Sequence, residues 1–278
     1  MAYAHNGDVE LYYDTFGDPA DPALLLVNGL GSQCINFAEP WCEKFVAKGI
    51  FVIRFDNRDV GLSTKLPDVA YTLRDMARDA IAVLDALGIE QAHVMGLSMG
   101  GMIVQTMAIE HPERLFTMTS MMSTTGDPDV GQSSPEARKL FTAPRPTDRE
   151  SYATRHLDSI RTWGSPAFYD EDRLRADANA AFDRCFSPDG QARQALTTAA
   201  PSRTEALRGV RIPTLVVHGS EDNLIDASGG RRTAEAIPGA RFVLIDGMGH
   251  DYPPQLWDQY VQLVYEMLVA TTRASAGT

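Results

Sequence analysis

Residues 92–101 read Ala-His-Val-Met-Gly-Leu-Ser-Met-Gly-Gly, and they say more about how the chain folds than any other segment. Val94 and Met95 belong to an apolar run that predicts a strand, and residues 102–110 have the spacing of a helix. Residues 96–100 between them match Gly-x-Ser-x-Gly, the nucleophile elbow, which is a sharp turn from a strand into a helix. Both the motif and its required context are therefore present.

The glycines on either side of Ser98 fit such a turn. The serine adopts a strained backbone conformation there, and side chains at positions 96 and 100 would collide with the turn. The Ser98 hydroxyl then stands above the sheet at the start of a helix, where the Met99 amide and the positive end of the helix dipole face an incoming oxyanion. An ordinary serine in a glycine-rich turn is the alternative, which the flanking strand and helix disfavour.

The rest of the chain alternates between strand and helix patterns. A half-buried antiparallel strand is expected at residues 9–16, buried strands at 24–27, 51–55, 214–218 and 242–245, and a further strand near 116–122. Helices are expected at residues 37–48, 72–87, 232–237 and 254–271. Continuous apolar strands are typical of sheets buried on both faces. We therefore expect an α/β fold with a mostly parallel central sheet flanked by helices.

The alternation stops between residues 126 and 208. This segment is rich in turn residues and contains helix patterns at residues 148–162 and 170–186, without a buried strand. An insertion of this length after a strand end is expected to lie over the crevice where ligands bind. We therefore expect a mainly helical cap, or lid, at residues 126–208, on a core formed by residues 1–125 and 209–278. Its aromatic residues could line a pocket, although for each of them packing inside the cap is favoured: Trp163, Phe168, Tyr169, Phe182 and Phe186.

A serine hydroxyl is a weak nucleophile near neutral pH and needs a general base. Of the six histidines, His250 follows the strand at residues 242–245 through a glycine-containing loop, Asp246-Gly-Met-Gly. This is where the chain order Ser, Asp, His places the base. The remaining histidines are expected to be structural or solvated: His5, His93, His111, His156 and His218.

The acid that orients the base should lie on a loop just beyond a parallel strand, between Ser98 and His250. Asp222 meets this condition, because it follows the apolar strand at residues 214–218. Its carboxylate would fix the tautomer of the imidazole and stabilise the imidazolium. Glu221, Asp226 and the more distant Asp127 are weaker candidates for the same role.

A second oxyanion donor is expected in the loop after the strand at residues 24–27. That loop reads Asn28-Gly-Leu-Gly31, and the amide of Leu30 is the candidate partner of the Met99 amide. A dinucleotide-binding loop is a weak alternative, because Cys34 occupies the place of the third glycine and no P-loop lysine follows.

Together these motifs resemble the α/β-hydrolase family over nearly the whole chain. Residues 55–63 look like the family's Asp-x-Arg-Gly-x-Gly-x-Ser turn, with Asp59 where glycine is usual, and residues 219–222 and 247–250 match its acid and base loops. The pattern is particularly similar to bacterial carboxylesterases of the aclacinomycin methylesterase group. Asn28 departs from the His-Gly of many members, but an asparagine can still tie down the loop by hydrogen bonds.

The resemblance implies a Ser98-Asp222-His250 triad and an acyl-enzyme route for carboxylic esters of small or medium apolar molecules, with no metal or organic cofactor. The partner expected is thus a small-molecule ester. The same triad also serves perhydrolases and carbon–carbon bond hydrolases, and a non-catalytic ligand receptor on this scaffold is a further alternative. A purely structural protein would leave the assembled triad unexplained.

Composition limits the setting and the partners. The chain has 278 residues and a formal net charge of −12, which argues against nucleic acid or an anionic membrane as a partner. Its three cysteines are odd in number and lack Cys-x-x-Cys spacing, which favours reduced thiols over a disulfide framework or a zinc site. Neither a secretion signal nor an apolar run of the ~20 residues needed to span a bilayer is visible. A cytoplasmic protein is expected.

Overall fold

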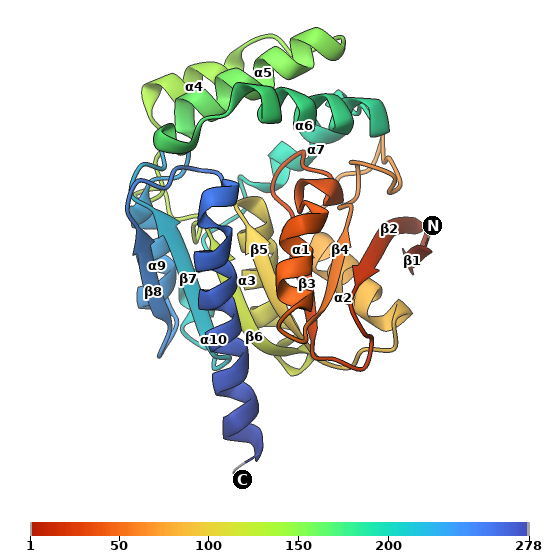
Figure 1. Ribbon diagram of the computed structural model, residues 1–278, viewed down its shortest axis with the longest axis vertical. Coiled ribbons are helices and arrows are strands. Elements are labelled where there is room, and N and C mark those ends of the chain that lie inside the picture. The colour runs from red at the N-terminus through yellow and green to blue at the C-terminus, as the bar shows by residue number, and fades with distance from the viewer. Residues whose placement is uncertain (1, 277–278) are drawn as a thin grey trace.

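The computed structural model describes residues 2–276 and contains an eight-stranded sheet with helices on both faces (Figure 1). The strand order is β1-β2-β4-β3-β5-β6-β7-β8. β1 and β2 are antiparallel to their neighbours, and β3 to β8 run parallel. The strands are β1 (Ala2–Asn6), β2 (Val9–Phe16), β3 (Ala23–Val27), β4 (Phe51–Phe55), β5 (Ala92–Leu97), β6 (Leu115–Met121), β7 (Thr214–Gly219) and β8 (Arg241–Ile245). The predicted α/β fold and its mostly parallel sheet are confirmed.

Two layers of helices cover this sheet. α1 (Glu39–Val46) and α10 (Trp257–Ala276) pack on one face, and α2 (Leu73–Ala86), α3 (Met99–Glu110) and α9 (Ala227–Ala236) pack on the other (Figure 1). Each layer encloses its own apolar cluster of buried side chains. The short helical turns between the larger elements are 3-10 helices: η1 (Cys34–Asn36), η2 (Pro112–Arg114), η3 (Pro166–Phe168) and η4 (Pro254–Leu256).

Local sequence signals set the ends of these helices. Thr72 caps α2 by accepting a hydrogen bond from the Asp75 amide, while the Asp75 carboxylate bonds back to the Thr72 amide. Asp226 caps α9 by accepting from the Ser228 amide, so α9 begins at Ala227 rather than at the expected residue 232.

One strand differs from the prediction in its burial. The sequence predicts a buried strand at residues 242–245, yet β8 is the last strand of the sheet, and Leu244 on it is 40% exposed. An edge strand has a neighbour on one side only, and an apolar run of this kind has the same composition in either position. β1, at the opposite edge, has no such run, and the sequence patterns do not predict it.

The segment between residues 126 and 208 is helical. It contains α4 (Pro135–Thr142), α5 (Arg149–Trp163), α6 (Glu171–Arg184), α7 (Pro188–Thr197) and α8 (Thr204–Leu207). Of these, α5 and α6 match the two predicted helix patterns, whereas α4, α7 and α8 are additional. α4, α5 and α6 lie above the edge of the sheet at the top of Figure 1, and α8 packs against α3 and α9. Within residues 2–276, no helix has the length and apolar character required to cross a bilayer.

The register of the parallel strands places the loops of interest at one edge. Val27 lies opposite Gly96, so the loop after β3 leaves the sheet beside the turn at Ser98. Gly219 lies opposite Ile245, so the loops that carry Asp222 and His250 leave neighbouring strands. All four loops follow carboxyl ends of parallel strands, which is the edge where α/β proteins bind ligands.

Candidate active site

Ser98 occupies a strained turn between β5 and α3. Its backbone has φ 55° and ψ −118°, a region that residues other than glycine rarely adopt. Neighbouring groups hold this conformation: the Ser98 amide donates to the Met121 carbonyl over 2.9 Å, and the Ser123 hydroxyl donates to the Ser98 carbonyl over 2.8 Å. The side chain of Ser98 is free of this network, so its hydroxyl is available to a reaction partner.

The two glycines of the motif are required by backbone contacts. A Cβ atom on Gly96 would lie 2.1 Å from the Gly100 carbonyl oxygen, and one on Gly100 would lie 2.1 Å from the Val27 carbonyl oxygen. A Cβ on Gly29 would meet the Ser98 Cβ at 3.3 Å, so the loop after β3 lies directly against Ser98. The collisions expected from the sequence therefore occur with backbone atoms, which cannot rotate away.

The two predicted oxyanion donors are unoccupied amides. Met99 is the first residue of α3, where a helix leaves its amides without internal partners, and Leu30 lies in the neighbouring loop. Among residues 2–276, neither the Leu30 nor the Met99 amide donates a hydrogen bond to another protein atom. Both are therefore free to bind an oxyanion.

Asn28 fixes the loop of Leu30, in agreement with the expectation from the sequence. Its Nδ2 donates to the Gln33 carbonyl over 2.8 Å, and its Oδ1 accepts from Asn36 Nδ2 over 3.0 Å. From the helical segment, Gln194 on α7 accepts from the Gly31 amide over 2.8 Å. Gln194 is fully buried, so this contact is shielded from water.

His250 and Asp222 are in direct contact. His250 Nδ1 lies 2.7 Å from Asp222 Oδ2, and the two side chains are 7% and 0% exposed. The other carboxylate oxygen, Oδ1, accepts from the amides of Leu224 and Ile225, each over 2.9 Å. Burial by itself raises the pKa of Asp222, but His250 and His218 outweigh this effect and lower the pKa to about 2. Asp222 is therefore ionised at neutral pH.

His218 is a neighbour of this pair whose position the sequence did not reveal. Its Nε2 lies 2.7 Å from the Ile225 carbonyl and 3.3 Å from Asp222 Oδ2, and the side chain is fully buried. Because Nε2 faces two acceptors it carries the proton, whereas Nδ1 is buried without a partner in the described chain. His218 thus donates to the Ile225 carbonyl and lies within reach of the Asp222 carboxylate. In the sequence, the one indication that these two side chains lie close together is that His218 precedes Asp222 by four residues at the end of a strand.

Ser98 stands at the same sheet edge as this pair but is not bonded to it. No hydrogen bond joins the Ser98 hydroxyl to His250 within the part of the chain that the structure describes. Such contacts are often long in the absence of substrate and shorten in the reacting complex. The structure thus joins His250, the candidate base, to Asp222, the candidate acid, and brings the loops of all predicted site residues to one edge.

The competing carboxylates are engaged elsewhere. Asp127 pairs with Arg232 over 2.8 Å and accepts hydrogen bonds from nearby hydroxyl groups. Asp226 caps α9, and Glu221 is exposed. None of these carboxylates contacts His250 in the described residues.

Asp59 occupies the position where the family usually has glycine. Its φ of 73° is left-handed, and its buried carboxylate forms two bonds with Arg193 on α7, of 2.9 and 2.7 Å. The adjacent Arg58 pairs with the buried Asp79 of α2 over 2.5 Å. Both contacts tie the turn to neighbouring helices.

The cysteines and His93 lie in the interior or are half-buried. Cys34 and Cys42 are buried, Cys185 is half-buried, and none of the three is in a disulfide. Burial raises the pKa of Cys42 to about 12 and lowers that of His93 to about 4, so both stay neutral at pH 7. Within residues 2–276, no cluster of three or more His, Cys, Asp or Glu side chains could hold a metal ion.

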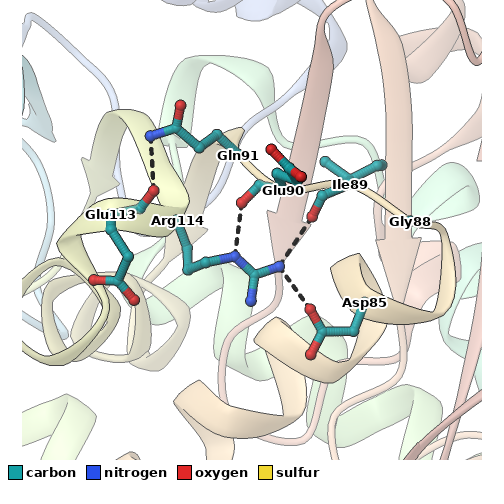
Figure 2. Close-up of a pocket in the computed structure, with 7 residues that line it drawn as sticks. All are labelled: Asp85, Gly88, Ile89, Glu90, Gln91, Glu113 and Arg114. Carbon is teal, nitrogen blue, oxygen red and sulfur yellow. Dashed lines mark hydrogen bonds and ion pairs between the residues drawn. The ribbon is translucent and has the colours of Figure 1, made fainter.

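An open depression near Arg114 lies away from these residues (Figure 2). It lies before β5, about 20 Å along the strand from Ser98 at 3.3 Å per residue. The Arg114 guanidinium is already occupied by Asp85 and by the carbonyls of Ile89 and Glu90. The depression therefore offers no free cation to a ligand and no contact with the chemistry at Ser98.

A family model, related proteins and a solved structure all place the chain in one family. The family described as "alpha/beta hydrolase fold" matches residues 22–253. Rhodomycin D methylesterase DnrP of Streptomyces peucetius is 33% identical, and the match covers 89% of this chain and 91% of that protein. A 2-hydroxymuconate semialdehyde hydrolase of Pseudomonas putida is 30% identical, with 78% and 76% covered. The crystal structure of the enol-lactonase from Burkholderia xenovorans LB400 matches with a TM-score of 0.79 and 26% identity, over 96% of this chain and 100% of that one.

Proposed function

Because the chain belongs to the α/β-hydrolase family, we propose that it is a carboxylic ester hydrolase that uses Ser98, His250 and Asp222 as a catalytic triad. Its substrates are esters of small to medium apolar molecules. The methylesterase and the enol-lactonase among its similar proteins are both named for ester substrates, which supports this reaction class.

The contact between His250 and Asp222 carries the proposal. A carboxylate that is fully buried, held by two backbone amides and ionised at neutral pH is placed 2.7 Å from an imidazole. Such a carboxylate fixes the imidazole tautomer and stabilises the positive charge that forms when the base takes a proton. The strained, glycine-flanked Ser98 leaves the same edge of the sheet, which supports its role as the nucleophile.

The mechanism follows from these positions. His250 Nε2 takes the proton of Ser98 as Oγ attacks the ester carbonyl, and the amides of Leu30 and Met99 bind the tetrahedral oxyanion. The leaving alcohol takes the proton from His250, which leaves an acyl-enzyme on Ser98. His250 then activates a water molecule that releases the carboxylic acid and restores the serine.

Residues 126–208 form the lid over this site in our proposal. Gln194 on α7 bonds to the oxyanion loop, and Trp163 at the end of α5 bonds to the base loop. The lid therefore contacts both halves of the reaction centre and would determine which esters reach Ser98. Residues 1–125 and 209–278 form the core beneath it.

Turnover of a short p-nitrophenyl ester by single-residue variants tests the proposal. His250→Gln and Asp222→Asn should each lower kcat at least about 100-fold, and Ser98→Ala should lower it at least about 1,000-fold. All three variants should retain the fold. Ser202→Ala and His5→Gln change exposed residues of the same types and should keep wild-type rates. Turnover by Ser98→Ala at the wild-type rate would refute the proposal.

Carbon–carbon bond hydrolysis is the second candidate. It is favoured by the similarity to a hydrolase named for 2-hydroxymuconate semialdehyde, a compound that contains no ester. A panel of esters varied separately in acyl chain and alcohol, run beside 2-hydroxymuconate semialdehyde and a peracid assay, separates the candidates. Ligand binding without turnover in every assay would instead favour a receptor.

A further inference from the structure

The loop that carries His250 is docked on the end of α5. The His250 amide donates to the Trp163 carbonyl over 2.5 Å, and the Gly249 amide donates to the Ser165 hydroxyl over 2.9 Å. Asp251 Oδ1 accepts from the Ser165 amide over 3.0 Å and from the Ser165 hydroxyl over 2.5 Å. Three consecutive residues centred on His250 are thus bonded to the helical segment.

The two segments approach each other at backbone contact. A Cβ atom on Gly249 would lie 2.1 Å from the Gly164 carbonyl carbon, and one on Gly164 would lie 3.0 Å from Asp251 Oδ2. Ser165 is 1% exposed. Water therefore has no room to replace these hydrogen bonds, and a lost bond would leave a buried polar group without a partner.

The Ser165 hydroxyl is the central part of this contact, because it both accepts and donates a hydrogen bond. It accepts a hydrogen bond from Gly249, on one side of His250, and donates one to Asp251, on the other side. Removing the hydroxyl would break one hydrogen bond on each side of His250, to Gly249 and to Asp251, and leave Asp251 bonded to the Ser165 amide alone. In the described part of the chain, neither Ser165 nor Asp251 is hydrogen-bonded to the Ser98 hydroxyl, and the residue that lies between their contacts is His250.

We propose that Ser165, together with Asp251, is a positioning residue that holds the catalytic base in register with the nucleophile. The helical segment thereby completes the active site as well as covering it. This inference rests on the proposed role of His250 as general base. A displacement of about 1 Å between reacting groups costs up to roughly 100-fold in rate, so a released base loop lowers kcat while substrate binding remains.

Charge is the alternative way in which Asp251 could act on His250. The titratable and charged groups that face Asp251 are His250, Arg173 and Tyr260, and burial raises the pKa of the Asp251 carboxyl while Ser165 opposes that rise. Asp251→Asn separates the two explanations. An asparagine keeps an Oδ1 acceptor for both Ser165 donors but removes the negative charge.

The experiment measures kcat, KM and the pH profile of kcat for p-nitrophenyl ester hydrolysis. Ser165→Ala and Asp251→Ala should lower kcat about 10- to 100-fold and change KM less than threefold. Asp251→Asn should keep kcat within threefold of wild type, with an unchanged pH profile. Thr162→Val is the matched control, because the Thr162 hydroxyl bonds only within α5, to the Asp158 carbonyl.

The outcomes separate this inference from the proposed function. Wild-type kcat in Ser165→Ala, beside an inactive His250→Gln, overturns the inference and leaves the proposed function intact. Full activity of His250→Gln overturns both. An Asp251→Asn variant as slow as Asp251→Ala, or with a shifted pH profile, shows that charge is what matters and also overturns the inference. If Ser165→Ala does not fold, the comparison of the two Asp251 variants decides.

Discussion

The strained backbone of Ser98 predicts that the proposed nucleophile is held at a cost in stability. With φ at 55° and ψ at −118°, the residue occupies a region suited to glycine. Ser98→Gly should therefore give a more stable protein than Ser98→Ala, although both variants lack the hydroxyl. Comparing these two variants isolates the backbone, because the change in side-chain chemistry is shared.

The magnitude follows from two opposing terms. A non-glycine residue in a sparsely populated backbone region costs about 1–3 kcal/mol, which glycine removes. Glycine also makes the unfolded chain more flexible, which costs about 0.5–1 kcal/mol relative to alanine. The balance favours Ser98→Gly by about 1 kcal/mol. For a chain of this size that corresponds to a rise in Tm of roughly 2–4 °C.

Thermal unfolding by circular dichroism, with chemical denaturation as a second probe, measures this difference. Both variants should be inactive toward p-nitrophenyl esters, and Ser98→Gly should unfold at the higher temperature. A Ser98→Gly variant that melts at or below Ser98→Ala would show that the strain at Ser98 does not exceed the cost of about 0.5–1 kcal/mol that glycine adds, and would contradict this prediction.

The remaining predictions concern the supports of the site. Gly100→Ala places a Cβ 2.1 Å from the Val27 carbonyl oxygen, so it should lower the free energy of unfolding by about 1–3 kcal/mol and also lower kcat. Gly209→Ala is the control, because the nearest atom to its new Cβ is 3.3 Å away. Equal Tm values for the two variants would contradict the predicted overlap at Gly100. Arg193→Ala leaves the buried Asp59 carboxylate without its ion partner, with the Leu66 amide as a remaining donor, and should cost about 3 kcal/mol. Asp59→Gly in the same chain should restore part of this loss by removing both the charge and the left-handed strain. A double variant no more stable than Arg193→Ala would refute that explanation. The lowered pKa of Asp222, about 2, means that its ionised form stabilises the fold above pH ~4 and that this contribution is lost as the pH falls toward 2. The difference in unfolding free energy between wild type and Asp222→Asn should thus narrow by about 2 kcal/mol from pH 5 to pH 2 in denaturant titrations, and a constant difference would contradict it.

Local patterns predicted the parts of the site that depend on a short stretch of chain. The turn at Ser98 was predictable because its glycines and the flanking strand and helix are adjacent in sequence. His250 and Asp222 were predictable because each follows an apolar strand, and parallel strands bring such loops to one edge of the sheet. The contact of 2.7 Å between them needed the structure, since the residues are separated by 28 positions.

Features that depend on packing were not predictable in this way. The edge position of β8 changes its burial without changing its apolar composition. α7 is short and polar on most of its surface, and its role becomes visible only through Gln194 and Arg193, which bond to distant loops. The link between Ser165 and Asp251 spans 86 positions and requires the docked helical segment. Such contacts arise from how elements pack, and no periodic pattern reports them.

Covalent labelling of Ser98 asks whether this serine is the nucleophile that His250 activates. Wild-type protein and His250→Gln would be treated with a fluorophosphonate at neutral pH, digested, and the modified peptide identified by mass spectrometry. A triad of Ser98, His250 and Asp222 predicts one rapid adduct on Ser98 in the wild type, loss of ester turnover in proportion to labelling, and at least about 100-fold slower labelling in His250→Gln. Ester hydrolysis that continues at full rate while Ser98 is fully labelled would contradict the triad.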